Sequence, residues 1–142
     1  MEPKKILAIE DDAFLSGLVA GKLVESGLSV VNTATGKDGL AKARLIHPDL
    51  ILLDIMLPDM GGFEVLEKIK ADPETRNIPV VILSNLGGRE EIERGVKLGA
   101  NSYLIKSNIL PNEVAEVVQN QLAGTGTPPT PPAAALGAVP SA

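Results

Sequence analysis

Apolar residues follow two different periods along the chain between Lys4 and about Leu122. Short continuous apolar runs of strand length alternate with longer segments in which apolar residues recur every three or four positions. Short apolar runs between helical segments are typical of parallel strands that are buried on both faces. The pattern therefore predicts five strand–helix units that form a parallel sheet, with right-handed crossovers and helices on both faces.

The predicted strands differ in how apolar they are. They cover residues 6–9, 28–32, 50–54, 80–83 and 102–105. The second run is short and weak, which predicts an edge strand, whereas the third is apolar on both faces, which predicts a central one. The helical segments between them have apolar stripes at Leu15, Leu18, Val19 and Leu23; Leu40 and Ala43; Phe63, Leu66 and Ile69; Ile92, Val96 and Leu98; and Val114, Val117, Val118 and Leu122.

Charged side chains stand where three of these strands end. Asp11 and Asp12 follow the first strand, Asp54 closes the third, and Lys106 follows the fifth. Because the carboxyl ends of parallel strands share one edge of a sheet, we expect these side chains to meet. Acids that lie so close repel one another unless a cation or a proton intervenes. The arrangement predicts a divalent metal site with one carboxylate left as a nucleophile.

Each of these residues also has a purely structural interpretation. The run Glu10-Asp11-Asp12 could cap a helix and interact with its dipole. Asp54 could be an ordinary loop acid, and Lys106 a solvated lysine. What favours a functional site is that all of these positions fall on the same edge of the predicted sheet.

Composition and charge narrow the functional classes. The chain has 142 residues and a net charge of −5, which argues against a surface that binds nucleic acid. It has no cysteine and only one histidine, His47, so zinc–thiolate sites, cysteine catalysis and histidine metal clusters are excluded. We find neither a signal peptide nor an apolar run long enough to span a bilayer, and we expect a soluble cytoplasmic protein without membrane partners.

The composition changes at Gly124. Residues 124–142 contain no charged and no aromatic residue and include five prolines. We therefore predict a folded domain over residues 1–123 and a flexible Pro/Ala-rich tail over residues 124–142. The tail is interpreted as a linker, with a proline-motif ligand for a partner's aromatic groove as the alternative.

Four motifs resemble those of the receiver domain of two-component response regulators, in particular chemotaxis-regulator-like proteins. They are Ile9-Glu10-Asp11-Asp12, residues 47–62, residues 79–84 and residues 99–106. The resemblance covers Lys4 to about Leu122. It implies a flavodoxin-like, doubly wound α/β fold with a five-stranded parallel sheet in the order 2-1-3-4-5 and helices on both faces.

The resemblance also implies a role for each acid at the predicted site. Asp54 is similar to the aspartate that accepts a phosphoryl group from a histidine kinase or a phosphotransfer protein. Asp11 and Asp12 resemble the acids that bind Mg²⁺, with Asp54 and the backbone carbonyl of Met56 as further ligands. Oxygen ligands of this kind suit Mg²⁺.

Three further residues resemble the family's catalytic and switch positions. Ser84 and Lys106 are similar to the residues that contact the phosphoryl oxygens. Ser84 and Tyr103 resemble the pair that changes with phosphorylation and alters a protein-binding surface on the fourth helix, fifth strand and fifth helix. Ser107 departs from the family, which usually has a proline there after a cis peptide bond.

Two other functional classes compete with the phosphorylation-driven switch. One is a binding module on a receiver scaffold that works without phosphorylation. The other is an enzyme such as a Mg²⁺-dependent phosphatase, which the absence of an Asp-x-Asp pair, a P-loop and a histidine base disfavours. We expect no enzymatic activity beyond self-catalysed phosphoryl acceptance and hydrolysis, an unknown output protein as partner, and a monomer or weak dimer.

Overall fold

Five parallel strands form one sheet in the order β2-β1-β3-β4-β5 in the computed structural model, which describes residues 3–124. The fold class and the strand order predicted from the sequence are therefore confirmed. The weak second strand lies at an edge and the apolar third strand at the centre, as expected. The strands are β1 (Lys5–Ile9), β2 (Ser29–Thr33), β3 (Leu50–Leu53), β4 (Val80–Ser84) and β5 (Ser102–Ile105).

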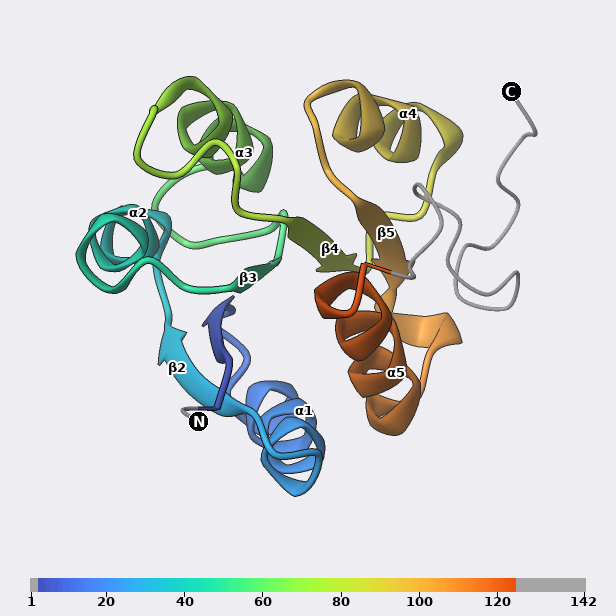
Figure 1. Cartoon of the computed structure of the whole chain (residues 1–142). Helices are drawn as coiled ribbons and strands as arrows, with labels where there is room; N and C mark the ends of the chain where they lie inside the picture. Colours follow the sequence, from blue (N-terminus) through green and yellow to red (C-terminus); the bar gives the residue numbers. More distant parts are fainter. Residues whose placement is uncertain (1–2, 125–142) are drawn as a thin grey trace.

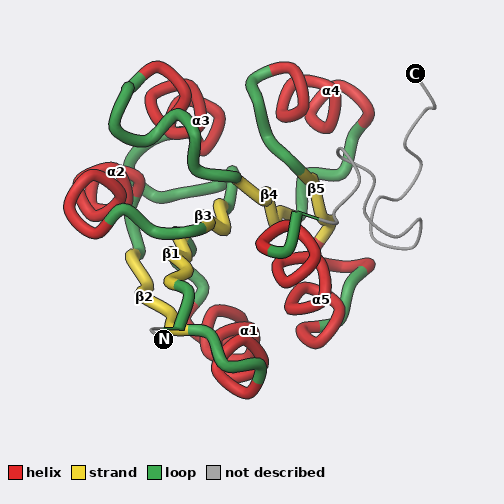
Figure 2. Tube along the Cα trace, viewed as in Figure 1, coloured by secondary structure: helices red, strands yellow, loops and turns green. Residues whose placement is uncertain are grey.

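Helices cover both faces of this sheet. In Figures 1 and 2, α1 and α5 lie on one side of the strands, and α2, α3 and α4 lie on the other. The helices are α1 (Ala13–Glu25), α2 (Gly36–Ile46), α3 (Gly62–Ala71), α4 (Arg89–Lys97) and α5 (Pro111–Leu122). The predicted tail lies, from residue 125 onward, outside the described residues. Among the described residues, no helix combines the length and the apolar content needed to cross a bilayer.

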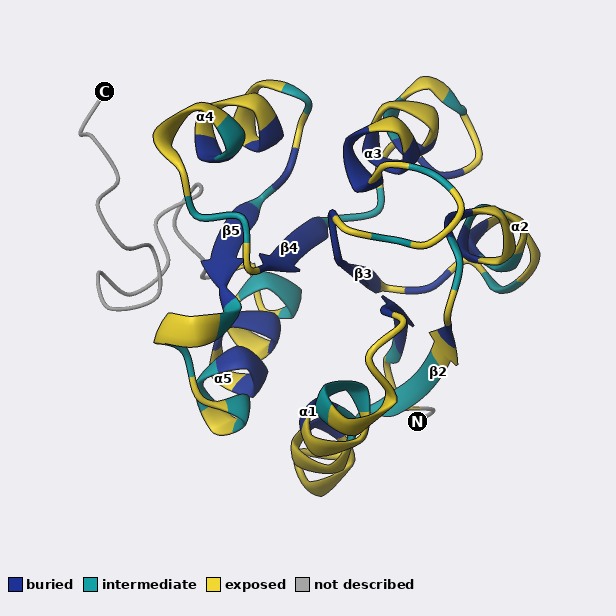
Figure 3. Ribbon diagram, turned by 180° about the vertical axis from the view of Figure 1, so that it is seen from behind, coloured by how far each residue is buried: buried dark blue, intermediate teal, exposed yellow. Residues whose placement is uncertain are grey.

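Two apolar cores flank the central strand, and β3 contributes to both. Ile51 and Leu53 belong to the core beneath α2, α3 and α4, whereas Leu50 and Leu52 belong to the core beneath α1 and α5. Successive side chains of a strand point to opposite faces, so a strand between two helical layers must be apolar throughout. Figure 3 shows β3, β4 and β5 in the colour of buried residues, β2 as mostly intermediate or exposed, and exposed residues on the outer helix faces.

Two residues of the predicted helical stripes are more exposed than expected. Leu18 on α1 is 45% exposed and Val96 on α4 is 37% exposed. The buried residues of α1 are Val19 and Leu23, which are four positions apart and share one face. Leu18 is adjacent in sequence to Val19, so it points about 100° away from that face. An apolar residue next to the buried stripe was therefore wrongly assigned to it.

Asp59 ties the loop after β3 to the start of α2. Its two carboxylate oxygens accept hydrogen bonds from the backbone nitrogens of Gly36 and Lys37, at 2.7 and 2.9 Å. These bonds hold the pKa of Asp59 below its usual value, because they favour the ionised form. The loop that carries the residues after Asp54 is thereby anchored to a neighbouring helix.

Gly62 allows α3 to begin directly against the end of β3. A Cβ atom at this position would lie 2.3 Å from the Cα of Ile55 and 2.4 Å from the backbone oxygen of Asp54. The backbone N–H of Gly62 donates to the Ile55 carbonyl at 2.7 Å. Both neighbours are backbone atoms, which cannot move aside as a flexible side chain can. The position of Asp54 therefore depends on a glycine at the start of α3.

We predict that Gly62→Ala destabilises the fold by about 3 kcal/mol, because the added methyl group overlaps the backbone. Gly61→Ala is the matched control, since a Cβ at Gly61 would meet nothing within 4 Å. The control should change stability by less than about 1 kcal/mol. Urea unfolding followed by circular dichroism measures both, and equal effects of the two substitutions would contradict the packing argument.

Candidate phosphoryl-acceptor site

Three carboxylates gather at the carboxyl edge of the sheet. Glu10 and Asp11 follow β1 and Asp54 follows β3, and one oxygen from each lies within 4.8 Å of the others. β1 and β3 are paired neighbours, with Ile9 opposite Leu53, so the residues that follow them emerge side by side. Glu10 is 7% exposed and Asp54 is 5% exposed, whereas Asp11 is open to solvent. The predicted meeting of Asp11 and Asp54 is therefore observed, with Glu10 as a third member.

Lys106 joins the two buried carboxylates. Its ammonium nitrogen lies 2.6 Å from Oε1 of Glu10 and 3.0 Å from Oδ2 of Asp54. The remaining oxygen of each carboxylate accepts a backbone hydrogen bond two residues along the chain, Glu10 from the nitrogen of Asp12 and Asp54 from that of Met56. The predicted proximity of Lys106 and Asp54 is thus observed, and both buried acids are satisfied on each oxygen.

The balance of charges at this edge shifts two pKa values. Burial is the main cause that raises the pKa of Glu10 to about 7, the neighbouring Asp54 adds to the rise, and the hydrogen bond from Lys106 opposes it. For Lys106, burial alone would lower the pKa, but its contacts with Glu10 and Asp54 outweigh burial and raise it. The cluster therefore holds its lysine charged and leaves a net negative charge available for a cation.

Asp12 does not lie in the acid cluster, where it was predicted to be. It is the N-cap of α1, and its Oδ1 accepts hydrogen bonds from the backbone nitrogens of Phe14 and Leu15 at 3.1 Å each. Capping is a common use of aspartate, because it satisfies free N–H groups at a helix start. Asp12 does not belong to the group formed by Glu10, Asp11 and Asp54. The structure favours Glu10 over Asp12 as the second acid of the pair.

A loop residue that the sequence did not point to links the two predicted switch residues. The backbone nitrogen of Leu86 donates to Oγ of Ser84 at 3.1 Å, and the backbone carbonyl of Leu86 accepts a hydrogen bond from the Tyr103 hydroxyl. Ser84 and Tyr103 are both buried. Burial raises the pKa of Tyr103 to about 12, so the hydroxyl remains a donor at neutral pH.

The segment after β5 places Lys106 without a cis peptide bond. Residues Lys106–Asn108 form a single 3₁₀ turn, η1, and no cis peptide occurs between residues 3 and 124. The Lys106–Ser107 bond is therefore trans, and Lys106 still reaches both acids. The departure from the family at Ser107 does not prevent the lysine from reaching the cluster.

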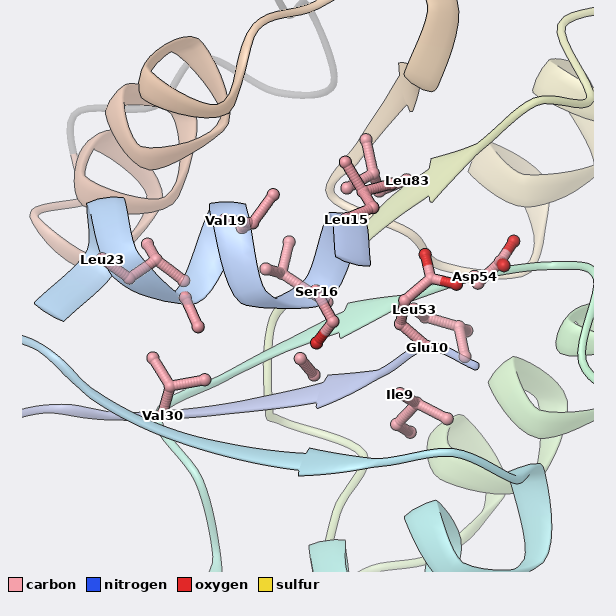
Figure 4. A pocket seen from close by; sticks show the side chains of 13 residues that line it. Ile9, Glu10, Leu15, Ser16, Val19, Leu23, Val30, Leu53, Asp54 and Leu83 are labelled. Atoms are coloured by element: carbon pink, nitrogen blue, oxygen red, sulfur yellow. The ribbon is translucent and has the colours of Figure 1, made fainter. Parts of the chain in front are cut away.

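A narrow cavity lies between α1 and the sheet, next to the acids (Figure 4). Its volume is about 20 Å³, close to the space that one water molecule needs. Most of its lining is aliphatic, with Glu10 and Asp54 at one end. A space of this size does not hold a small-molecule substrate.

The chain belongs to the family described as "Response regulator receiver domain", whose model matches residues 6–119. The match runs from the second residue of β1 to within three residues of the end of α5. Two-component signalling is therefore the process in which a domain of this class takes part.

Several known proteins share this domain. The chain is 39% identical over 114 residues to the "DNA-binding dual master transcriptional regulator RpaA" of Synechocystis, covering 80% of this chain but only 46% of that protein. It is 32% identical over 114 residues to the "Polar-differentiation response regulator DivK" of Brucella ovis, covering 80% of this chain and 93% of that protein. The phosphorylated cyanobacterial phytochrome response regulator RcpA has a similar solved structure, with a TM-score of 0.75, 33% identity and coverage of 90% of this chain and 99% of that one.

We predict that Lys106→Met destabilises the fold by about 3 kcal/mol without divalent cations, because two buried acids lose their shared counter-charge. Added Mg²⁺ should stabilise this variant more than the unchanged protein, since the ion supplies the missing positive charge. Lys68→Met, at an exposed position on α3, is the control. Thermal unfolding with chelator and with Mg²⁺ measures both effects; a Lys106→Met variant as stable as the control would exclude the ion-pair argument.

Proposed function

We propose that this chain accepts a phosphoryl group on Asp54 from the phosphohistidine of a histidine kinase or a phosphotransfer protein. The observation that carries the proposal is the position of Asp54 at the end of the central strand, 3.0 Å from the ammonium of Lys106 and within a group of acids. The family supports it, and so does the solved structure of RcpA, which is described as phosphorylated.

The reaction itself is a simple displacement at phosphorus. A carboxylate oxygen of Asp54 forms a bond to the phosphorus atom while the bond from phosphorus to the donor imidazole nitrogen breaks, and the nitrogen keeps the electron pair. Such a transfer needs alignment and charge neutralisation more than covalent help from the protein. Lys106 provides a fixed positive charge beside the carboxylate, and the fully buried Ser84 provides a hydroxyl at the end of the neighbouring strand β4.

The acids suit a magnesium ion as the cofactor. The carboxylates of Glu10, Asp11 and Asp54 offer oxygen atoms alone, which is the ligand type that Mg²⁺ prefers. We propose that these three residues and the backbone carbonyl of Met56 hold the ion. When bound, the ion would neutralise charge on the phosphoryl oxygens. Asp12, which caps α1, is not part of this ligand set.

The output is proposed to pass through Ser84 and Tyr103. If Ser84 turns its hydroxyl towards a phosphoryl group, it gives up its contact with the backbone of Leu86. That same residue holds the Tyr103 hydroxyl, so a change at one contact can bias the other. The surface of α4, β5 and α5 would then present a different face to an output protein. Beyond accepting and losing its own phosphoryl group, the chain is proposed not to be an enzyme.

Asp54→Asn should abolish phosphorylation, because the amide replaces the nucleophilic carboxylate. The measurement is intact-mass spectrometry after incubation with acetyl phosphate and Mg²⁺. Asp49→Asn, at the opposite end of β3, is the control and should still gain the mass of one phosphoryl group. No mass gain in the unchanged protein would favour the alternative, a binding module that works without phosphorylation; an undiminished gain in Asp54→Asn would place the phosphoryl group elsewhere.

The choice between Glu10 and Asp12 can be tested by metal affinity. Glu10→Gln should weaken binding of Mg²⁺ or Mn²⁺ by about tenfold or more, because it removes one carboxylate of the group. Asp12→Asn should leave affinity within about twofold, since asparagine caps a helix as well as aspartate does. Isothermal titration calorimetry measures both. A loss of affinity in Asp12→Asn as large as in Glu10→Gln would restore Asp12 to the metal site.

A further inference from the structure

β2 leaves one edge of the sheet open. In the described part of the chain the strand pairs with β1 alone, and the nitrogen of Ser29 and the carbonyl of Thr33 bond to residues next to β1. Along a parallel strand, alternate residues bond to the same neighbour. The backbone N–H and C=O groups of Val30 and Asn32 therefore point away from the sheet, toward solvent. They form a short row of donors and acceptors that bond to no other backbone group within residues 3–124.

This edge has none of the usual protection against pairing. Exposed edge strands commonly carry a charged residue, a proline or a bulge that discourages a second strand. The sequence of β2, Ser-Val-Val-Asn-Thr, contains no charge and no proline, and it is in regular register with β1 at all five positions. At the other edge of the sheet, all four residues of β5 are buried. β2 is thus the edge on which another strand can add.

A groove beside β2 adds a second contact surface. It lies between the end of the strand and α2 and has a volume of about 440 Å³. Leu45 lines it and is 74% exposed, so its side chain is available for contact with a partner there. Thr33 also lines it, and its buried hydroxyl has no hydrogen-bond partner within residues 3–124. Both an apolar and a polar group are left without a partner along the same edge.

We propose that this edge associates with a second copy of the chain, through antiparallel pairing of β2 with β2 about a two-fold axis. If Val31 lies opposite Val31 of the copy, Val30 lies opposite Asn32 of the copy on either side of the axis. The outward-facing residues of both strands then form hydrogen-bonded pairs, each exchanging both bonds. A one-residue shift would place an outward-facing residue opposite an inward-facing one, and a two-residue shift would leave one outward-facing residue of each strand opposite a residue outside β2, so this register uses the outward-facing groups most fully.

The charges on α2 favour the same partner. Asp38 and Lys42 line the groove one turn apart, and neither makes an ion pair in the described part of the chain. A two-fold axis runs α2 antiparallel to its copy, so the end that carries Asp38 faces the end that carries Lys42 and Leu45. Asp38 of each copy can therefore pair with Lys42 of the other, which gives two equivalent ion pairs across the axis. Because the strand is only five residues long, we expect a weak dimer in equilibrium with monomer.

Two measurements test the proposal. Sedimentation equilibrium of the full chain, at protein concentrations from about 10 µM to about 1 mM, measures dimerisation, and hydrogen exchange over the same range locates the interface. The amides of Val30 and Asn32 should gain protection as concentration rises, while that of Val31, already bonded to β1, should not. Leu45→Lys should weaken dimerisation by about tenfold or more. Leu110→Lys, at an aliphatic residue that is 61% exposed elsewhere, is the control and should leave dimerisation unchanged.

Reversing the charges at positions 38 and 42 distinguishes two-fold pairing from non-specific association. Lys42→Glu and Asp38→Lys should each dimerise poorly alone, because each places like charges across the axis. An equimolar mixture of the two variants should recover association, since both cross-axis contacts then join opposite charges. A chain that stays monomeric at all concentrations would overturn the proposal. So would a dimer that leaves exchange at Val30 unchanged or that Leu110→Lys disrupts, since either result places the interface elsewhere.

Discussion

The ion pairs of Lys106 with Glu10 and Asp54 are the constraint on which the site depends. They join the ends of β1, β3 and β5, which are separated in sequence by about forty to fifty residues each. Two buried carboxylates would repel each other without the ammonium between them. The ammonium therefore permits the two acids to be buried side by side at the edge of the sheet. The Lys106 ammonium nitrogen therefore both joins three strand ends and sets the charge of the site.

The fold was largely predictable because apolar periodicity reports burial directly. The run 50–54 indicated a strand between two helical layers, and its first four residues do alternate between two cores. The weak run at 28–32 indicated an edge, where β2 lies. The errors concern residues next to a stripe, such as Leu18, because periodicity in a short helix does not separate neighbouring positions on its surface.

The acids at the site were only partly predictable. Topology brings the ends of β1 and β3 together, and this was sufficient to place Asp54 beside the acids after β1. Which of three consecutive acids faces the site depends on where the strand ends and the helix begins. β1 ends at Ile9, so Glu10 turns inward, Asp11 stays exposed and Asp12 caps α1. Strand alternation offered a signal for Glu10, but the prediction took Asp11 and Asp12 as the acids that follow the first strand.

The role of Leu86 could not be predicted from its side chain. It links Ser84 to Tyr103 entirely through its main chain, by an N–H on one side and a carbonyl on the other. Any residue except proline supplies the same two groups. Replacing the Leu86 side chain would therefore leave both contacts intact, although replacing Ser84 or Tyr103 would remove one of them. Replacing the peptide bond itself, for example by an ester, is the kind of change that would reach the Leu86 contacts.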